Sequence, residues 1–102
     1  MTSQTKTHYM LGEQIRQLRE SKGLLLRQAA AYLEIDTALM SKLERGERKV
    51  QKEHVIKLAK FFGVNEKELL TQWLCEKVLD VVSNEPMAEV ALKMAIKNIE
   101  TK

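Results

Sequence analysis

Apolar residues recur every three or four positions along most of the chain, which is the spacing of one face of an α-helix. Glycine follows three of these segments directly, and a helix commonly ends at glycine. No segment shows the two-residue alternation typical of a half-buried strand, so an all-α fold is expected. The predicted helices span residues 9–22, 26–33, 37–45, 52–62, 65–82 and 86–99.

Capping residues support several of these boundaries. Asp36 is a good N-cap for the helix over 37–45, and Asn65 with Glu68 forms a capping-box pattern before the next long helix. The helix over 26–33 instead begins at two leucines, for which local propensity gives no reason. Pro86 is expected to open the last helix. Only about three residues separate the second and third helices, so they must cross steeply, as in a helix-turn-helix unit.

Chain length, hydrophobic content and net charge limit the number of domains and the kinds of partner that the sequence fits. The chain has 102 residues, of which 44% are hydrophobic, and this fits one globular domain with a helical extension. Its formal net charge is +3 and its pI is about 9.1. The basic excess lies in residues 1–71, with a balance of +4, whereas residues 72–102 carry −1. Such a charge permits nucleic-acid binding without establishing it.

Several classes of protein are disfavoured. No apolar run approaches the roughly 20 residues of a membrane span, and the N-terminus lacks the apolar core of a signal peptide. One cysteine, Cys75, suits a reducing cytoplasm. His8 and His54 have no clustered partners, and three His or Cys residues fall short of the usual zinc set. We therefore expect no catalytic or metal site, no cofactor and no small-molecule ligand.

Three stretches together resemble the Cro/CI-like helix-turn-helix family, also called XRE: LGEQIRQLRESKG, AAAYLEIDTALMSKLERGERK and VIKLAKFFGVNEKELL. The likeness covers about residues 10–71. Its most specific pieces are Lys42-Leu-Glu-Arg-Gly46 and the run from Leu58 to Val64. It implies a flexible N-terminus over 1–9, a five-helix lambda-repressor-like domain over 10–71, and a C-terminal helical extension over 72–102. It also implies double-stranded DNA as partner and a regulator that is not an enzyme.

In this family the third helix enters the major groove, which admits one α-helix. Carried over by position, base contacts fall on Thr37, Ala38, Ser41 and Lys42. Phosphate contacts fall on Arg27, Arg45, Arg48, Lys49 and Lys52. The alternative is that these polar residues form an ordinary solvated surface. Leu39 departs from the family, which commonly has a small polar residue at that position.

The resemblance assigns two further roles. Arg19 and Glu44 match a family ion pair between the first and third helices, which is structural rather than DNA-binding. The extension carries more apolar surface than a terminal tail needs, so we expect a homodimer interface there, the alternative being that the last helix folds back on its own domain. The interface residues are predicted to be Trp73, Leu74, Val78, Leu79, Val82, Leu92, Ile96 and Ile99.

Three functions remain open at this stage. The leading hypothesis is a cytoplasmic transcriptional repressor that binds an inverted-repeat operator as a dimer. An antitoxin or a restriction-modification controller has the same features. A protein-interaction module that uses the fold without DNA is the third, and it is favoured by Leu25, Leu26 and Leu39 on or near the DNA-facing side.

Overall fold

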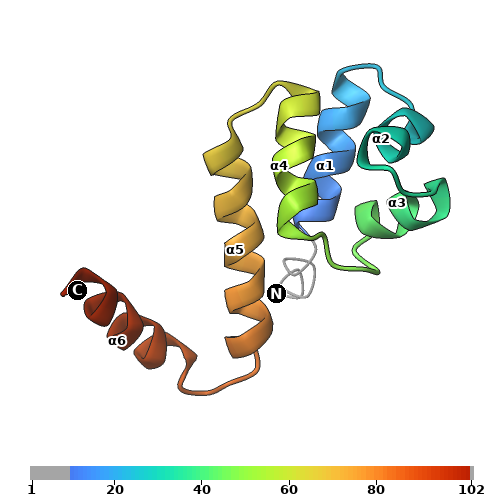
Figure 1. Ribbon diagram of the computed structural model, residues 1–102. Coiled ribbons are helices and arrows are strands. Elements are labelled where there is room, and N and C mark those ends of the chain that lie inside the picture. Colours follow the sequence, from blue (N-terminus) through green and yellow to red (C-terminus); the bar gives the residue numbers. More distant parts are fainter. Residues whose placement is uncertain (1–9, 102) are drawn as a thin grey trace.

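The computed structural model describes residues 10–101, which form six α-helices and no strand (Figure 1). Residues 1–9, predicted to be a flexible N-terminus, lie outside the described range. The observed helices confirm the all-α prediction, and their ends fall within two residues of the predicted ones. They are α1 (Met10–Ser21), α2 (Leu26–Leu33), α3 (Thr37–Glu44), α4 (Lys52–Phe62), α5 (Glu66–Val82) and α6 (Ala88–Glu100).

The hydrophobic core is built by α1 to α4 and the first half of α5. In Figure 1, α1 and α4 lie side by side, with α2 and α3 on one side and α5 on the other. Each helix contributes its apolar stripe, because burying that stripe removes it from water. The largest fully buried side chains are Phe62, Leu11, Ile15, Met40, Leu58 and Val55. The predicted domain boundary at residues 71 and 72 lies inside the continuous helix α5.

The end of α3 lies directly against the first turn of α1. A Cβ atom on Gly12 would lie 2.4 Å from the carbonyl oxygen of Leu43 and 2.8 Å from that of Glu44. Both neighbours are backbone atoms, so neither can rotate away as a side chain would. Glycine at this position therefore allows the close approach that sets the position of α3 on the domain.

Two of the three unexplained leucines belong to the core. Leu26 and Leu39 pack against the buried cluster, whereas Leu25 is 48% exposed. Leu25 is the N-cap of α2, and its backbone N–H donates to the side-chain oxygen of Gln28 at 2.7 Å. Gln28 thus supplies the side-chain half of a capping box, a feature that was not predicted from the sequence.

Pro86 lies in a turn and not in the first turn of the last helix. The N–H of Ala88 donates to the carbonyl of Glu85 at 3.1 Å, which closes a turn with Pro86 at its second position, where the proline ring is favoured. Helix α6 consequently starts two residues later than predicted, and it extends away from α1–α4 (Figure 1). None of the residues of α6 is buried within its own chain.

We predict that Gly12→Ala destabilises the fold strongly. The added methyl group overlaps two backbone carbonyls, and overpacking of this kind costs about 1–3 kcal/mol or more. Chemical denaturation followed by circular dichroism measures the loss. Gly63→Ala is the control, because Gly63 has a φ of 70° and open space around it, so only left-handed strain of about 1–2 kcal/mol is added. A smaller loss for Gly12→Ala than for Gly63→Ala would contradict the close approach.

Candidate nucleic-acid interface

A turn of three residues joins α2 to α3. Glu34 ends α2 in the left-handed conformation, with φ 61° and ψ 42°, and the N–H of Ile35 donates to the carbonyl of Ala30 at 3.0 Å. Asp36 then caps α3, since its carboxylate accepts from the N–H of Leu39 at 2.7 Å. These hydrogen bonds hold α2 and α3 in the tight helix-turn-helix arrangement that was predicted from the short connection between them.

The outer face of α3 is short, exposed and polar. Thr37, Ala38 and Lys42 are exposed, while Met40 and Leu43 on the opposite face are buried in the core. Ser41 is half-buried, and its hydroxyl oxygen accepts from the guanidinium of Arg45. The four predicted base-contact residues therefore lie on one helix, and three of them are exposed.

All five predicted phosphate ligands are exposed. Arg27 lies in the first turn of α2, Lys52 begins α4, and Arg48 lies in the loop between α3 and α4. Arg45 is the C-cap of α3 and pairs with Glu47 at 2.8 Å, and the hydrogen bond from Arg45 lowers the pKa of Glu47. A partner anion would have to compete with Glu47 for Arg45.

Arg16 is an additional cation beside this surface. It lines a hollow between α1, α2 and α3 together with Arg19, Ser41 and Arg45, and it pairs with Glu20 one turn further along α1 at 3.2 Å. Arg16 was not among the contacts predicted from the sequence. The available signal was its spacing of three residues from Arg19, which places both side chains on one face of the helix.

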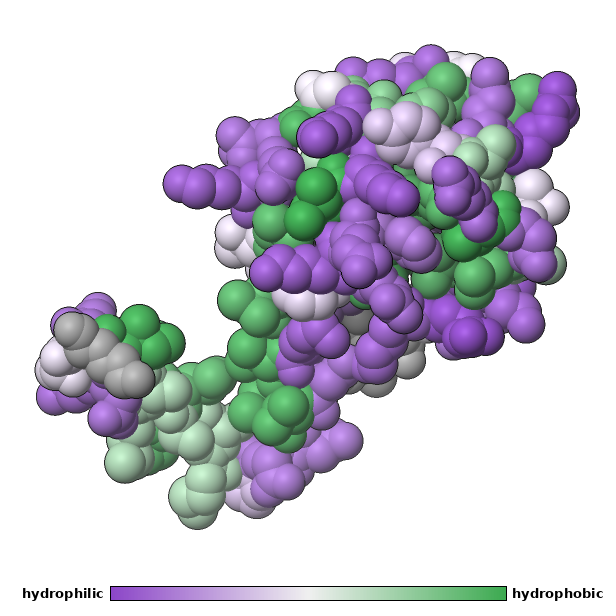
Figure 2. Space-filling model, viewed as in Figure 1, coloured by the Kyte–Doolittle hydropathy of each residue, from purple (hydrophilic) through white to green (hydrophobic). Residues whose placement is uncertain are grey.

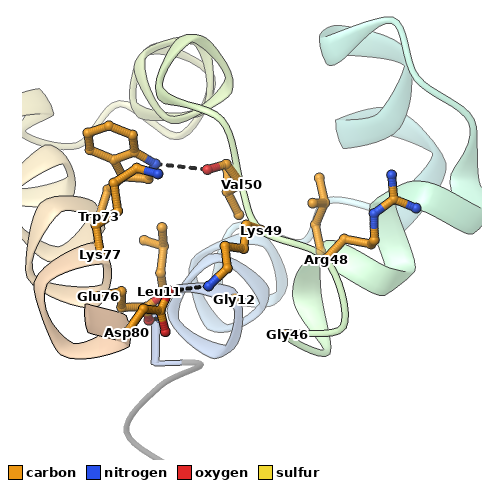
Figure 3. Close-up of a pocket in the computed structure, with 11 residues that line it drawn as sticks. Leu11, Gly12, Gly46, Arg48, Lys49, Val50, Trp73, Glu76, Lys77 and Asp80 are labelled. Carbon is orange, nitrogen blue, oxygen red and sulfur yellow. Dashed lines mark hydrogen bonds and ion pairs between the residues drawn. The ribbon is translucent and has the colours of Figure 1, made fainter. Parts of the chain in front are cut away.

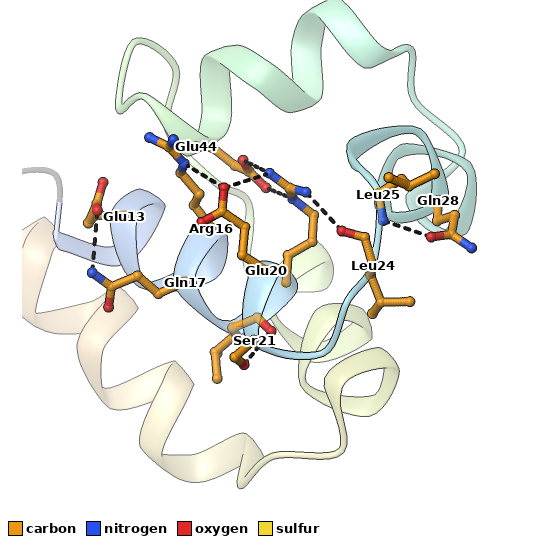
Figure 4. Close-up of polar contacts among 11 residues, drawn as sticks. Glu13, Arg16, Gln17, Glu20, Ser21, Leu24, Leu25, Gln28 and Glu44 are labelled. Atoms are coloured by element: carbon orange, nitrogen blue, oxygen red, sulfur yellow. Dashed lines mark hydrogen bonds and ion pairs between the residues drawn. The ribbon is translucent and has the colours of Figure 1, made fainter.

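The ion pair between Arg19 and Glu44 is present, as the family resemblance implied (Figure 4). The Arg19 guanidinium donates to both carboxylate oxygens of Glu44, at 2.7 and 3.0 Å, and also to the carbonyl of Leu24 at 2.9 Å. The Glu44 side chain is only 5% exposed, and its hydrogen bond raises the pKa of Arg19. This pair joins α1, the start of α2 and the end of α3.

A second set of contacts joins α5 to the loop after α3 and to the start of α1. The indole N–H of Trp73 donates to the carbonyl of Val50 at 2.8 Å, and Lys49 pairs with Asp80 (Figure 3). Glu76 accepts from the backbone N–H of Leu11. Trp73 was predicted to lie in a dimer interface, but its half-buried ring packs against the domain's own core. Lys49, a predicted phosphate ligand, lies against α5.

Apolar side chains are left uncovered on the second half of α5 and on α6. Figure 2 shows hydrophobic residues along the lower half of α5 and on part of α6, whereas hydrophilic residues cover much of the α1–α4 part of this face. Of the predicted interface residues, Leu79, Val82 and Leu92 are half-buried. The exposed large apolar residues of this part are Leu74, Val78, Val81, Met87, Val90, Met94, Ile96 and Ile99, at 37% to 75% exposure.

Residues 10–101 contain neither a membrane span nor a metal cluster. No helix in that range is both long and apolar enough to cross a bilayer. No three His, Cys, Asp or Glu side chains among the same residues are arranged to hold a metal ion.

Comparison with known proteins agrees with this geometry. A family model described as a helix-turn-helix domain matches residues 10–72. Two crystal structures of the clp gene regulator ClgR from Corynebacterium glutamicum are similar to the chain, each at 26% identity and over 88% of the ClgR chain. They cover 67% and 82% of this chain, with TM-scores of 0.57 and 0.58. No curated protein sequence gave a significant match.

We predict that Glu44→Ala lowers thermal stability before it alters DNA preference. Removing Glu44 takes both of its hydrogen bonds from the largely buried Arg19 guanidinium, whose remaining carboxylate contact is the longer one with Glu20 at 3.9 Å, and this costs about 3–5 kcal/mol. The melting temperature, followed by circular dichroism, measures this loss. Glu20→Ala is the matched control, because Glu20 is 53% exposed and a surface pair contributes about 1 kcal/mol or less. Equal melting temperatures for the two variants would contradict the structural role of Glu44.

Proposed function

Because the chain belongs to the helix-turn-helix domain family of DNA-binding transcription regulators, we propose that it is a repressor that binds an inverted-repeat operator as a homodimer. Residues 10–71 would form the DNA-binding domain, and residues 72–102 would carry the dimer interface. The observation that carries this proposal is the short exposed helix α3 with cations on both sides. The family is non-enzymatic, in agreement with the sequence prediction.

The proposed DNA contacts follow from the dimensions of the duplex. The major groove is about 12 Å wide, so it admits α3 with its exposed Thr37, Ala38 and Lys42 toward the base edges. Lys42 can donate to guanine O6 or N7, and the Ala38 methyl group can meet a thymine methyl. The exposed Arg27, Arg48 and Lys52 would neutralise the flanking phosphates. These phosphate contacts supply affinity, whereas α3 supplies base choice.

The proposed dimer rests on the uncovered apolar surface of α5 and α6. Burying one large aliphatic side chain removes on the order of 100 Å² of apolar surface from water, which contributes about 2.5 kcal/mol at about 25 cal/mol/Å². Eight exposed residues of this kind reach several hundred Å², which is near the roughly 800 Å² per partner of a stable interface. We propose that a second copy of the chain covers this apolar surface. The second copy would also supply a second α3, which an inverted-repeat operator requires.

The packing of two leucines argues against a module that uses this fold without DNA. Leu26 and Leu39 are partly buried and pack against the core. Leu25 remains exposed, but it also serves as the N-cap of α2. Of the three leucines that favoured a protein partner near α3, only Leu25 is therefore exposed.

We predict that Lys42→Ala relaxes base preference. Loss of a base contact costs about 1–3 kcal/mol on the preferred sequence and much less on other duplexes. Selection of bound sequences from a random duplex pool, followed by binding titrations, measures both effects. Lys67→Ala is the control with the same change of charge, since Lys67 lies at the start of α5, away from α3 (Figure 1). Failure of the wild-type protein to retain any duplex at low ionic strength would remove the proposed function.

We also predict that Ile96→Asp converts the dimer into a monomer that keeps its fold. Ile96 is 53% exposed and contributes nothing to the monomer core, so a charge there disrupts only the proposed interface. Light scattering gives the mass, and circular dichroism checks the fold. Lys93→Gln, on the charged side of the same helix, should remain dimeric. A wild-type protein that is monomeric at micromolar concentration would exclude the dimer.

A further inference from the structure

Two neighbouring cations in the loop between α3 and α4 point in opposite directions. Figure 3 shows Arg48 directed toward the side of α2 and α3, and Lys49 directed toward α5. Lys49 forms an ion pair with Asp80, which is 31 residues away in the sequence. Arg48 is exposed, and its side chain is directed away from α5 (Figure 3). The family resemblance implies a phosphate contact for both Arg48 and Lys49, but only Lys49 has an ion pair with α5.

The residue after Lys49 is also held by α5. Val50 is 7% exposed, and its carbonyl accepts from the indole N–H of Trp73 at 2.8 Å. The ammonium of Lys77 lies 4.8 Å from the centre of the Trp73 ring, within the range of a cation–π interaction. Two successive loop residues are therefore attached to one helix, one by its side chain and one by its backbone.

We propose that Lys49 is a positioning residue that anchors the loop after α3 to α5 through Asp80, so that Arg48, and not Lys49, neutralises a DNA phosphate. This inference rests on the proposed function. The Lys49 side chain is 68% exposed, so a phosphate that bound its ammonium would have to compete with Asp80, whereas no such ion pair among the described residues holds Arg48 to α5. The two anchoring contacts fix the backbone on both sides of the peptide bond that joins residues 49 and 50. The direction of Arg48 is thereby set by a helix that does not itself reach the groove.

The salt dependence of DNA binding separates the two roles. The slope of log K against log salt falls by about 0.9 for each phosphate that the protein no longer neutralises. Arg48→Met should therefore reduce the slope by about one unit per protomer. Lys49→Met should keep the wild-type slope, while affinity falls by up to about fivefold because the loop is less well held. A mixed-sequence duplex of roughly 30 base pairs, about three helical turns, serves as the probe.

A second measurement needs no DNA. Trp73 is the only tryptophan in the chain, so its fluorescence reports directly on the contact with the loop. Lys49→Met and Asp80→Asn should each shift the Trp73 emission toward the red and increase its quenching by acrylamide. The double variant should show no further change, because both single changes remove the same contact. Arg48→Met should leave the emission at its wild-type position.

The outcomes distinguish the two proposals. If Lys49→Met lowers the salt slope as much as Arg48→Met does, Lys49 binds a phosphate and the positioning role is wrong. If the emission of Lys49→Met and Asp80→Asn is unchanged, the anchor is wrong, whether or not DNA is bound. If the wild-type protein binds no duplex while the emission shifts as expected, the anchor stands as a structural contact, but its role in DNA binding and the proposed function both fail.

Discussion

The orientation of α3 depends on one buried ion pair. Arg19 binds both carboxylate oxygens of Glu44 and, through a third hydrogen bond, the carbonyl of Leu24 just before α2. A charge buried without a partner is very unfavourable, so any movement that separates these groups is opposed by several kcal/mol. The close contact at Gly12 holds the same end of α3 from another direction. The exposed face of α3 is consequently presented by a rigid support.

The features of the fold that were predicted from the sequence are those set by residues close together in the chain. Helix ends follow from Asp36, Asn65 and the glycines that stop helices, and these act within a few residues of themselves. The ion pair of Arg19 and Glu44 spans 25 residues, and only the family resemblance indicated it. The proposed base contacts on α3 were likewise assigned only by the family resemblance.

The contacts that escaped prediction join distant segments. Nothing near Lys49 in the sequence distinguishes it from Arg48, since the difference lies in Asp80, two helices later. Trp73 and Leu74 are neighbours on one apolar helix, yet Trp73 packs on the core and Leu74 is exposed. Periodicity identifies apolar positions, but it cannot say which partner covers each one until the helices are placed in space.

The completeness of the core without α6 has a consequence for regulation. Because no residue of α6 is buried in its own chain, a single protomer holds its full hydrophobic core before any partner arrives. Dissociation of the proposed dimer would then release folded chains, in contrast to obligate dimers whose protomers unfold on separation. Occupancy of a two-part operator would rise steeply with the cellular level of the protein, since assembly and DNA binding would both follow mass action. Small changes in its synthesis or degradation would thus be amplified at the promoter.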